Sequence, residues 1–174
     1  MDPHAAVRRS TRAEDPDAVA VYAAEDEAMP DGGRRFRRFS EIQSFVDDAV
    51  AEPFWEDAFP DAPVSVEVLR RSSSATFSAA HVTDDGWDGV IWIRDGSWDV
   101  VTVVHELAHV AAGSWRVPGR WASEPGHGPR FVDALCRLWR RHLGVIAYGA
   151  LRVSLSDHGV GTRDHHGPRS TSIE

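Results

Sequence analysis

The pattern of apolar and polar positions divides the chain into a strand-forming part and a later helix-forming part. Between residues 40 and 53, apolar side chains return at every third or fourth position, which predicts an amphipathic helix. Valines alternate with polar residues over residues 64 to 68, as in a strand with one buried face, and two further strands are expected over residues 75 to 82 and 90 to 93. Three strands in succession indicate a small antiparallel or mixed sheet.

The remainder of the folded chain has the pattern of helices. These are expected over residues 98 to 112, 129 to 143 and 145 to 156, with Gly113 and Gly144 at the positions where helices stop. Strands that come first and helices that follow are the order of an α+β fold.

The two ends of the chain have a different composition from the middle. Residues 1 to 33 mix acidic residues with a Pro-Asp-Gly-Gly turn and predict a loosely packed lead-in with a short helix around residues 18 to 27. Residues 159 to 174 carry almost nothing apolar and are expected to form a disordered tail. One folded domain is therefore expected over residues 34 to 158, since 174 residues are too few for two well-buried cores.

Composition excludes several classes of function. All 19 basic residues are arginine, which removes lysine-dependent chemistry, and the net charge of -8 argues against nucleic-acid binding. The lone Cys136 excludes an internal disulfide and a cysteine-based zinc ribbon. No apolar run approaches the roughly 20 residues that span a bilayer, and the N-terminus lacks a secretory signal. We therefore expect a cytoplasmic protein without a membrane partner.

The candidate chemistry lies in the segment His-Glu-Leu-Ala-His at residues 105 to 109. Two histidines four residues apart project from the same face of a helix, so His105 and His109 can share one metal ion. Imidazole is a good ligand for zinc, and Glu106 stands where it can accept a proton from the attacking water. This predicts a zinc ion as cofactor and Glu106 as the catalytic base.

The surroundings of the motif strengthen that prediction. Thr102, His105, Glu106 and His109 fall in one stripe of the helix, and nearly all its other positions are apolar, which predicts burial on almost every side. Unsatisfied polar groups in such a helix cost several kcal/mol. A metal ion at the stripe satisfies them.

A tetrahedral catalytic site needs a third protein ligand and an open position. His127 is the candidate, because a Pro- and Gly-rich loop returns the chain to it and Pro129 then suits the first turn of a helix. Two alternatives stay open at this stage: Glu124 could take the ligand position, or His127 could only cap the helix. The second His-Gly-Pro-Arg, at residues 166 to 169, has no apolar helix after it and is assigned to the tail.

The helical motif followed by His-Gly-Pro-Arg-Phe resembles the SprT-like, or Spartan-like, minimal zincin metallopeptidases and related bacterial metallohydrolases over about residues 90 to 143. The resemblance implies a zincin-like fold, with a sheet packed on the metal-binding helix, and it implies His105, His109 and His127 as zinc ligands with Glu106 as general base. The DNA-repair role of some members is not carried over, because this chain has neither a zinc ribbon nor a basic DNA-binding segment.

These residues predict an enzyme that hydrolyses an amide, with a peptide or protein as substrate. A small-molecule amide hydrolase and a non-catalytic zinc-binding regulatory domain are the alternatives. An extended substrate could pair with the strand over residues 90 to 93, unless that strand is central and covered. Tyr148, His142 and Arg152 are candidates by residue type for stabilising the oxyanion.

Overall fold

The computed structural model describes residues 15 to 75, 78 to 83, 86 to 113 and 126 to 161. Within these ranges six helices and a small three-stranded sheet form an α+β fold, as the order of the sequence patterns predicts. The helices are α2 (Pro16–Ala28), α3 (Phe39–Ala51), α4 (Pro53–Ala58), α5 (Val100–Gly113), α6 (Pro129–His142) and α7 (Val145–Asp157), and the strands are β1 (Ser65–Arg71), β2 (Ala79–Val82) and β3 (Asp88–Arg94).

The sheet is mixed and has the order β1-β3-β2. Strand β1 pairs in parallel with β3, and β2 pairs with β3 in the antiparallel direction. Strand β3, which contains residues 90 to 93, is thus central and has both edges taken. An extended ligand therefore cannot add to β3, and the alternative in which this strand is covered holds.

The outer edge of β1 is closed by one side chain. The backbone N–H of Val68 donates to Oε1 of Gln43 at 2.8 Å, and Nε2 of Gln43 donates to the carbonyl of Val66 at 3.1 Å. The amide of Gln43, on α3, thus occupies two of the backbone groups that a further strand would use. Among the described strands, β2 forms the other edge of the sheet.

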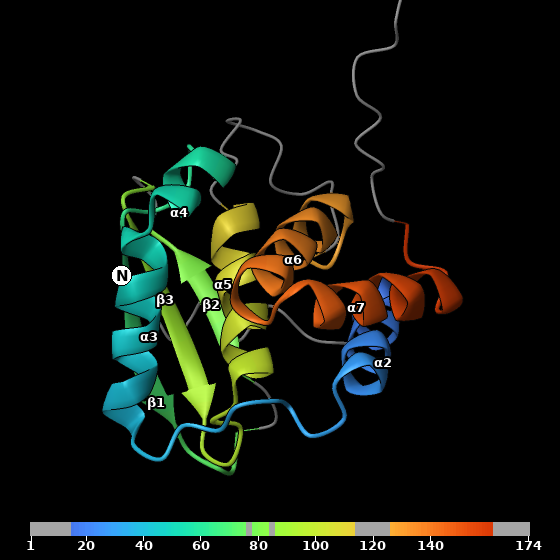
Figure 1. Cartoon of the computed structure of the whole chain (residues 1–174). Helices are drawn as coiled ribbons and strands as arrows, with labels where there is room; N and C mark the ends of the chain where they lie inside the picture. The colour runs from blue at the N-terminus through green and yellow to red at the C-terminus, as the bar shows by residue number, and fades with distance from the viewer. Residues whose placement is uncertain (1–14, 76–77, 84–85, 114–125, 162–174) are drawn as a thin grey trace, which may run out of the picture.

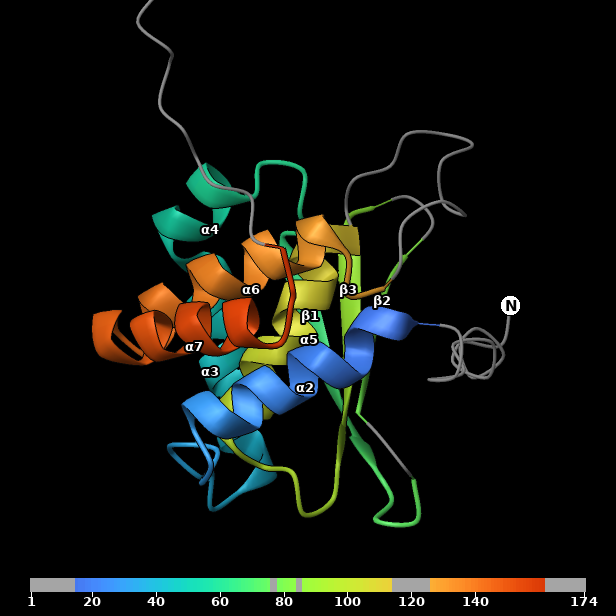
Figure 2. The ribbon, with the colours of Figure 1, turned by 90° about the vertical axis from the view of Figure 1, so that its right-hand side faces the viewer.

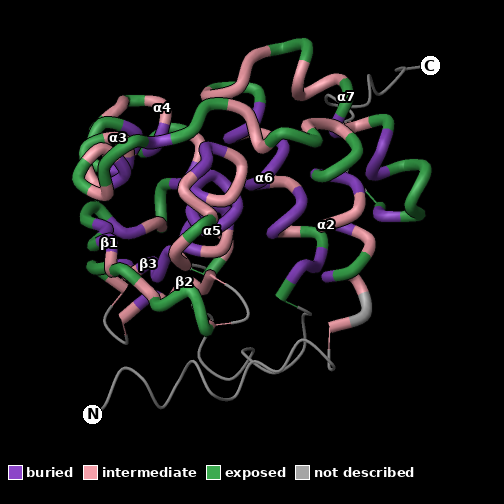
Figure 3. Tube along the Cα trace, turned by 90° about the horizontal axis from the view of Figure 1, so that it is seen from below, coloured by how far each residue is buried: buried purple, intermediate pink, exposed green. Residues whose placement is uncertain are grey.

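The helices cover one face of the sheet and continue away from it as further layers (Figure 1). Helices α3 and α5 pack on the sheet, α6 packs on α5, and α7 packs on both α6 and α2. Seen from below, buried positions concentrate where α5 lies between the sheet and α6 (Figure 3). Ile91 and Ile93 of β3 and Leu107 of α5 have no exposed surface, so α5 is the centre of the core.

Gly89 allows α5 to approach the sheet closely. A Cβ atom at this position of β3 would lie 2.9 Å from Cγ1 of Val110 and 3.2 Å from Cγ2 of Val66. Only a residue without a side chain fits there, because heavy atoms do not approach so closely. The contact fixes the distance between the sheet and the helix that carries the histidine motif.

Helix α2 lies within the segment 1 to 33 that was expected to form a loosely packed lead-in, of which residues 1 to 14 lie outside the described residues. Ala18, Val21 and Ala24 are at most 1% exposed, and α2 lies beside α7 (Figure 2). The short helix expected around residues 18 to 27 is confirmed, but its apolar side chains belong to the core. Burying them is favourable, since each apolar side chain removed from water contributes about 1.5–3 kcal/mol.

The segment after α2 is bonded to the start of α5. The N–H of Val100 donates to the carbonyl of Arg34, and the N–H of Phe36 donates to the carbonyl of Trp98, each at 2.9 Å. These bonds tie the N-terminal part of the chain to the motif helix.

No helix of the described part is long and apolar enough to cross a membrane.

Candidate metal centre

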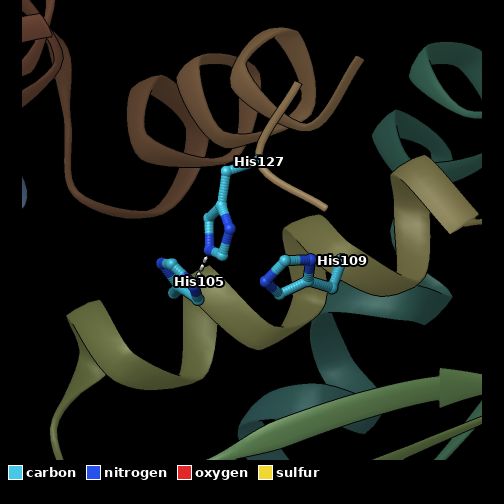
Figure 4. A group of neighbouring side chains, drawn as sticks. All are labelled: His105, His109 and His127. Carbon is cyan, nitrogen blue, oxygen red and sulfur yellow. Dashed lines mark hydrogen bonds between the residues drawn. The ribbon is translucent and has the colours of Figure 1, made fainter. Parts of the chain in front are cut away.

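Three histidines from two parts of the chain meet at one point beside α5. His105 and His109 lie on successive turns of that helix, and His127 lies in the segment that leads into α6 (Figure 4). One ring nitrogen of each lies within 4.8 Å of the others, so the three are close enough to bind one metal ion. His105 is 2% exposed and His127 is 7% exposed.

The start of α5 is fixed by its own sequence. Oδ1 of Asp99 accepts from the backbone N–H of Thr102 at 2.8 Å, which satisfies one of the free N–H groups of the first turn. The valines and Leu107 then bury the helix on the sheet side, as expected from the apolar pattern. His105 and His109 are thereby turned toward α6, with ring centroids 5.0 Å apart.

His127 is held by a carboxylate from the N-terminal part of the chain. Oδ2 of Asp15 accepts from the backbone N–H of His127 at 2.9 Å and lies 2.7 Å from its ring Nδ1. The chain then turns into α6 at Pro129, as predicted, and the ring of Phe131 packs against His127 and His109 with centroids 4.7 and 4.3 Å away.

His105 has an equivalent partner. Oε2 of Glu25 lies 2.7 Å from Nδ1 of His105, and both side chains are 3% exposed. The ring of Tyr22 stacks on the same imidazole, with a centroid distance of 4.8 Å and an interplanar angle of 16°. Two side chains of α2 thus fix the plane and the direction of the His105 ring.

These partners determine which nitrogens face the centre. An imidazole whose Nδ1 donates to a carboxylate presents Nε2 as a bare acceptor when the ring is neutral. The Nε2 atoms of His105 and His127 lie 3.2 Å apart. Two bare lone pairs at that distance repel each other unless a cation or a proton lies between them. Burial and, to a smaller extent, the nearby His105 lower the pKa of His127, although Asp15 opposes this effect. A lowered pKa makes it unfavourable for a proton to lie between the two Nε2 atoms.

The charges of the site also fit a cation. Burial lowers the pKa of His109, and the neighbouring His105 and His127 add to this effect, so this ring is neutral near pH 7. Around the three rings stand the carboxyl groups of Asp15, Glu25 and Glu106. A divalent cation offsets this concentration of buried negative charge, whereas buried carboxylates without such compensation are costly.

Glu106 lies within the same buried stripe and is 3% exposed. Within the described residues its Oε2 atom is buried and has no hydrogen-bond partner. Burial raises the pKa of Glu106 to about 7, with His105 opposing and Glu25 adding to the rise. A carboxyl group in this state can hold or release a proton near neutral pH.

The residues expected from the sequence fall into two groups. His105, His109 and His127 come together, and Glu106 is buried on the same helix, next to His105 in sequence. His142 lies at the far end of α6, about 20 Å along the helix from His127, and packs on Phe45.

The other expected residues lie elsewhere or outside the described ranges. Tyr148, in α7, lies next to Arg140, which is in the last turn of α6. The guanidinium carbon of Arg140 is 6.0 Å from the centroid of the Tyr148 ring. Arg152 lies near Cys136, where it opposes the burial that raises the pKa of the thiol to about 11. Glu124 lies outside the described residues.

Asp15, Tyr22 and Glu25 are the residues that the sequence reasoning did not identify. The sequence carried a weak signal for Asp15 only. Asp15 precedes Pro16, a combination typical of a helix start, and its side chain does accept from the N–H of Asp17 at 3.1 Å. For Glu25 there was no such signal, because residues 18 to 24 are all apolar and do not show which side of the helix is buried.

The chain was compared with models of known protein families, with curated proteins and with solved structures, and no match was found. Its function is therefore inferred from the geometry of the site and from the motif.

Proposed function

We propose that the protein is a zinc-dependent hydrolase that cleaves peptide bonds, of the zincin type that the SprT-like resemblance implies. The observation that carries the proposal is the convergence of three imidazole nitrogens within 4.8 Å, next to a buried carboxyl group on the same helix. A site that only bound a metal for structural reasons would not need Glu106.

Zinc is the metal that fits this donor set. Three imidazoles and one open position are typical of catalytic zinc sites, whereas calcium and magnesium prefer oxygen ligands. When bound in this way, zinc acts as a Lewis acid and lowers the pKa of a coordinated water toward about 7. His105 and His127 would bind through Nε2, since their Nδ1 atoms face Glu25 and Asp15.

Glu106 is the group that moves protons in this proposal. It takes a proton from the attacking water and returns it to the leaving amine, so the amide is cleaved into an acid and an amine with no other reactant. Within the described residues Oε2 of Glu106 has no hydrogen-bond partner, so binding a water or substrate proton would break no existing bond. A carboxyl group suits both steps, because it can accept the proton from water and donate it again to the amine.

The sheet suggests how an extended substrate is held. Strand β2 packs beside α5 and forms the edge of the sheet opposite β1. A peptide that paired with β2 would extend the sheet next to the motif helix, since backbone groups at a free strand edge accept an added strand. The substrate edge is therefore proposed to be β2.

The test is metal analysis of the purified protein together with digestion of a peptide library and a panel of small amides. We expect about one zinc per chain and cleavage of peptides that Glu106→Gln protein does not cleave. Cleavage of small amides alone would replace the peptidase proposal with a small-molecule hydrolase. Zinc binding without turnover of either panel would favour the regulatory domain, and absence of any metal after reconstitution would overturn the proposal.

A further inference from the structure

Helix α2 contributes one face to the metal centre although it lies far from the motif in sequence. With about 100° per residue, Tyr22 and Glu25 project from the same side of the helix as the buried Ala18 and Val21. Asp15 stands at the N-terminal end of that side as the helix cap. The helix thus presents two carboxylates and an aromatic ring to the three histidines.

Each carboxylate meets a different ligand histidine. Glu25 is bonded to His105, and Asp15 is bonded to His127, in both cases at Nδ1 and at 2.7 Å. The bond from Asp15 to the backbone N–H of His127 also fixes the position of the chain before α6. Neither imidazole can rotate its Nε2 atom away from the centre without breaking such a bond.

Glu25 has no adequate explanation as a residue that stabilises the fold. It is 3% exposed, and its Oε1 atom is buried without a hydrogen-bond partner among the described residues. Burying an ionised carboxylate with incomplete hydrogen bonding is unfavourable, and apolar residues of similar size serve a core at least as well. Its placement is accounted for by the ring that it contacts.

The segment after α2 and helix α7 position α2 beside the metal centre. Gly32 and Gly33 have φ angles of +71° and +70°, and they turn the chain so that it runs along the first residues of α5. On its other side α2 packs against α7. The two carboxylates are therefore held in place relative to His105 before any ion binds.

We infer that Asp15 and Glu25 are positioning residues of the proposed zinc site, which fix His105 and His127 with Nε2 toward the ion and raise the affinity for it. The inference rests on the proposed function, because it concerns the same site. Partners of this kind orient the imidazole and increase its basicity as a ligand, and their loss weakens metal binding by about 10- to 100-fold.

The experiment measures zinc affinity by competition with a chromophoric chelator in the full-length protein and in Glu25→Gln and Asp15→Asn. Asp26→Asn is the matched control, because Asp26 is an exposed carboxylate on the same helix, next to Glu25. Cobalt(II) absorption reports the ligand geometry independently of activity. Thermal unfolding in the presence of chelator reports the stability of the metal-free fold.

We expect each positioning variant to bind zinc about 10- to 100-fold more weakly, with an altered cobalt spectrum, while Asp26→Asn stays within about twofold of the original protein. Metal-free Glu25→Gln should be about as stable as the original, because the amide oxygen of glutamine can still accept from Nδ1 of His105. Equal affinities in all four proteins would overturn the inference and leave the proposed function standing. A loss of affinity matched by a loss of metal-free stability would show a structural role and would also overturn it. Failure of the original protein to bind zinc would instead overturn the proposed function.

Discussion

One oxygen of Asp15 accepts from both the backbone and the ring of His127, across 112 positions of the sequence. The orientation of the His127 ring and the course of the chain before α6 are thus set by the same carboxylate. Since His105 is set by Glu25 in a similar way, the two Nε2 atoms that face each other are fixed by α2 and not by the motif helix alone.

His127→Ala should weaken zinc binding more strongly than the loss of either carboxylate partner, which is expected to cost about 10- to 100-fold. Two remaining imidazoles make an incomplete tetrahedral site. Competition with a chelator measures the affinity, and His158→Ala, which removes a histidine at the end of α7, is the control. If Glu124→Ala removes the metal while His127→Ala does not, the site belongs to the glutamate-liganded zincins.

Glu106→Gln should retain zinc while hydrolysis of an identified substrate falls by about 10²-fold or more. Glutamine keeps the size of the side chain but cannot accept the proton from water. Elemental analysis and steady-state kinetics on the same preparation separate the two effects. Full activity in this variant would show that Glu106 is not the base.

Gly32→Ala should destabilise the protein by more than Gly159→Ala does. Both glycines have positive φ angles, +71° and +73°, which cost a residue with a side chain about 1–2 kcal/mol. A Cβ at Gly32 would also lie 2.9 Å from Cγ of Asp99, the residue that caps α5, whereas nothing lies within 4 Å of a Cβ at Gly159. Urea unfolding of both variants measures the difference, and equal losses would show that the contact with Asp99 is relieved without cost.

His142 should make the protein less stable as the pH falls below about 6.5. Burial lowers the pKa of His142, with Glu52 opposing, and its Nε2 has no acceptor among the described residues. The unfolded chain, with a histidine pKa of about 6.5, then binds more protons than the folded chain, so stability falls as the pH decreases. Unfolding in urea at pH 7.5 and 5.5, with chelator present, should show a smaller loss in His142→Gln. The same loss in both proteins would contradict this explanation.

Much of the architecture could be predicted because its apolar patterns are regular. The expected helix over residues 98 to 112 corresponds to α5, and the expected strand over residues 90 to 93 lies within β3. The strand expected over residues 75 to 82 corresponds to β2, which is shorter than expected and covers Ala79–Val82. Helix α4 was not predicted, because Pro53 was taken as the end of a helix, whereas it opens the first turn of a new one.

The contribution of α2 could not be predicted from local patterns. Residues 18 to 24 are apolar without interruption, so they define no polar and apolar side, and the place of Glu25 on a buried side is not visible in the sequence. The bonds from Asp15 to His127 and from Glu25 to His105 join residues 112 and 80 positions apart. Only the packing of α2 against the rest of the fold brings them together.

The side chain of Gln43 limits how molecules of this protein can associate through their sheets. Because it occupies the N–H of Val68 and the carbonyl of Val66, β1 offers no template to a strand from another molecule at these positions. Two molecules could still join edge to edge through β2, and the outer edges of such a pair would then be two β1 strands, each with Gln43 bonded to it. Gln43 thus disfavours the addition of a third molecule and leaves the other side of the sheet without such a contact.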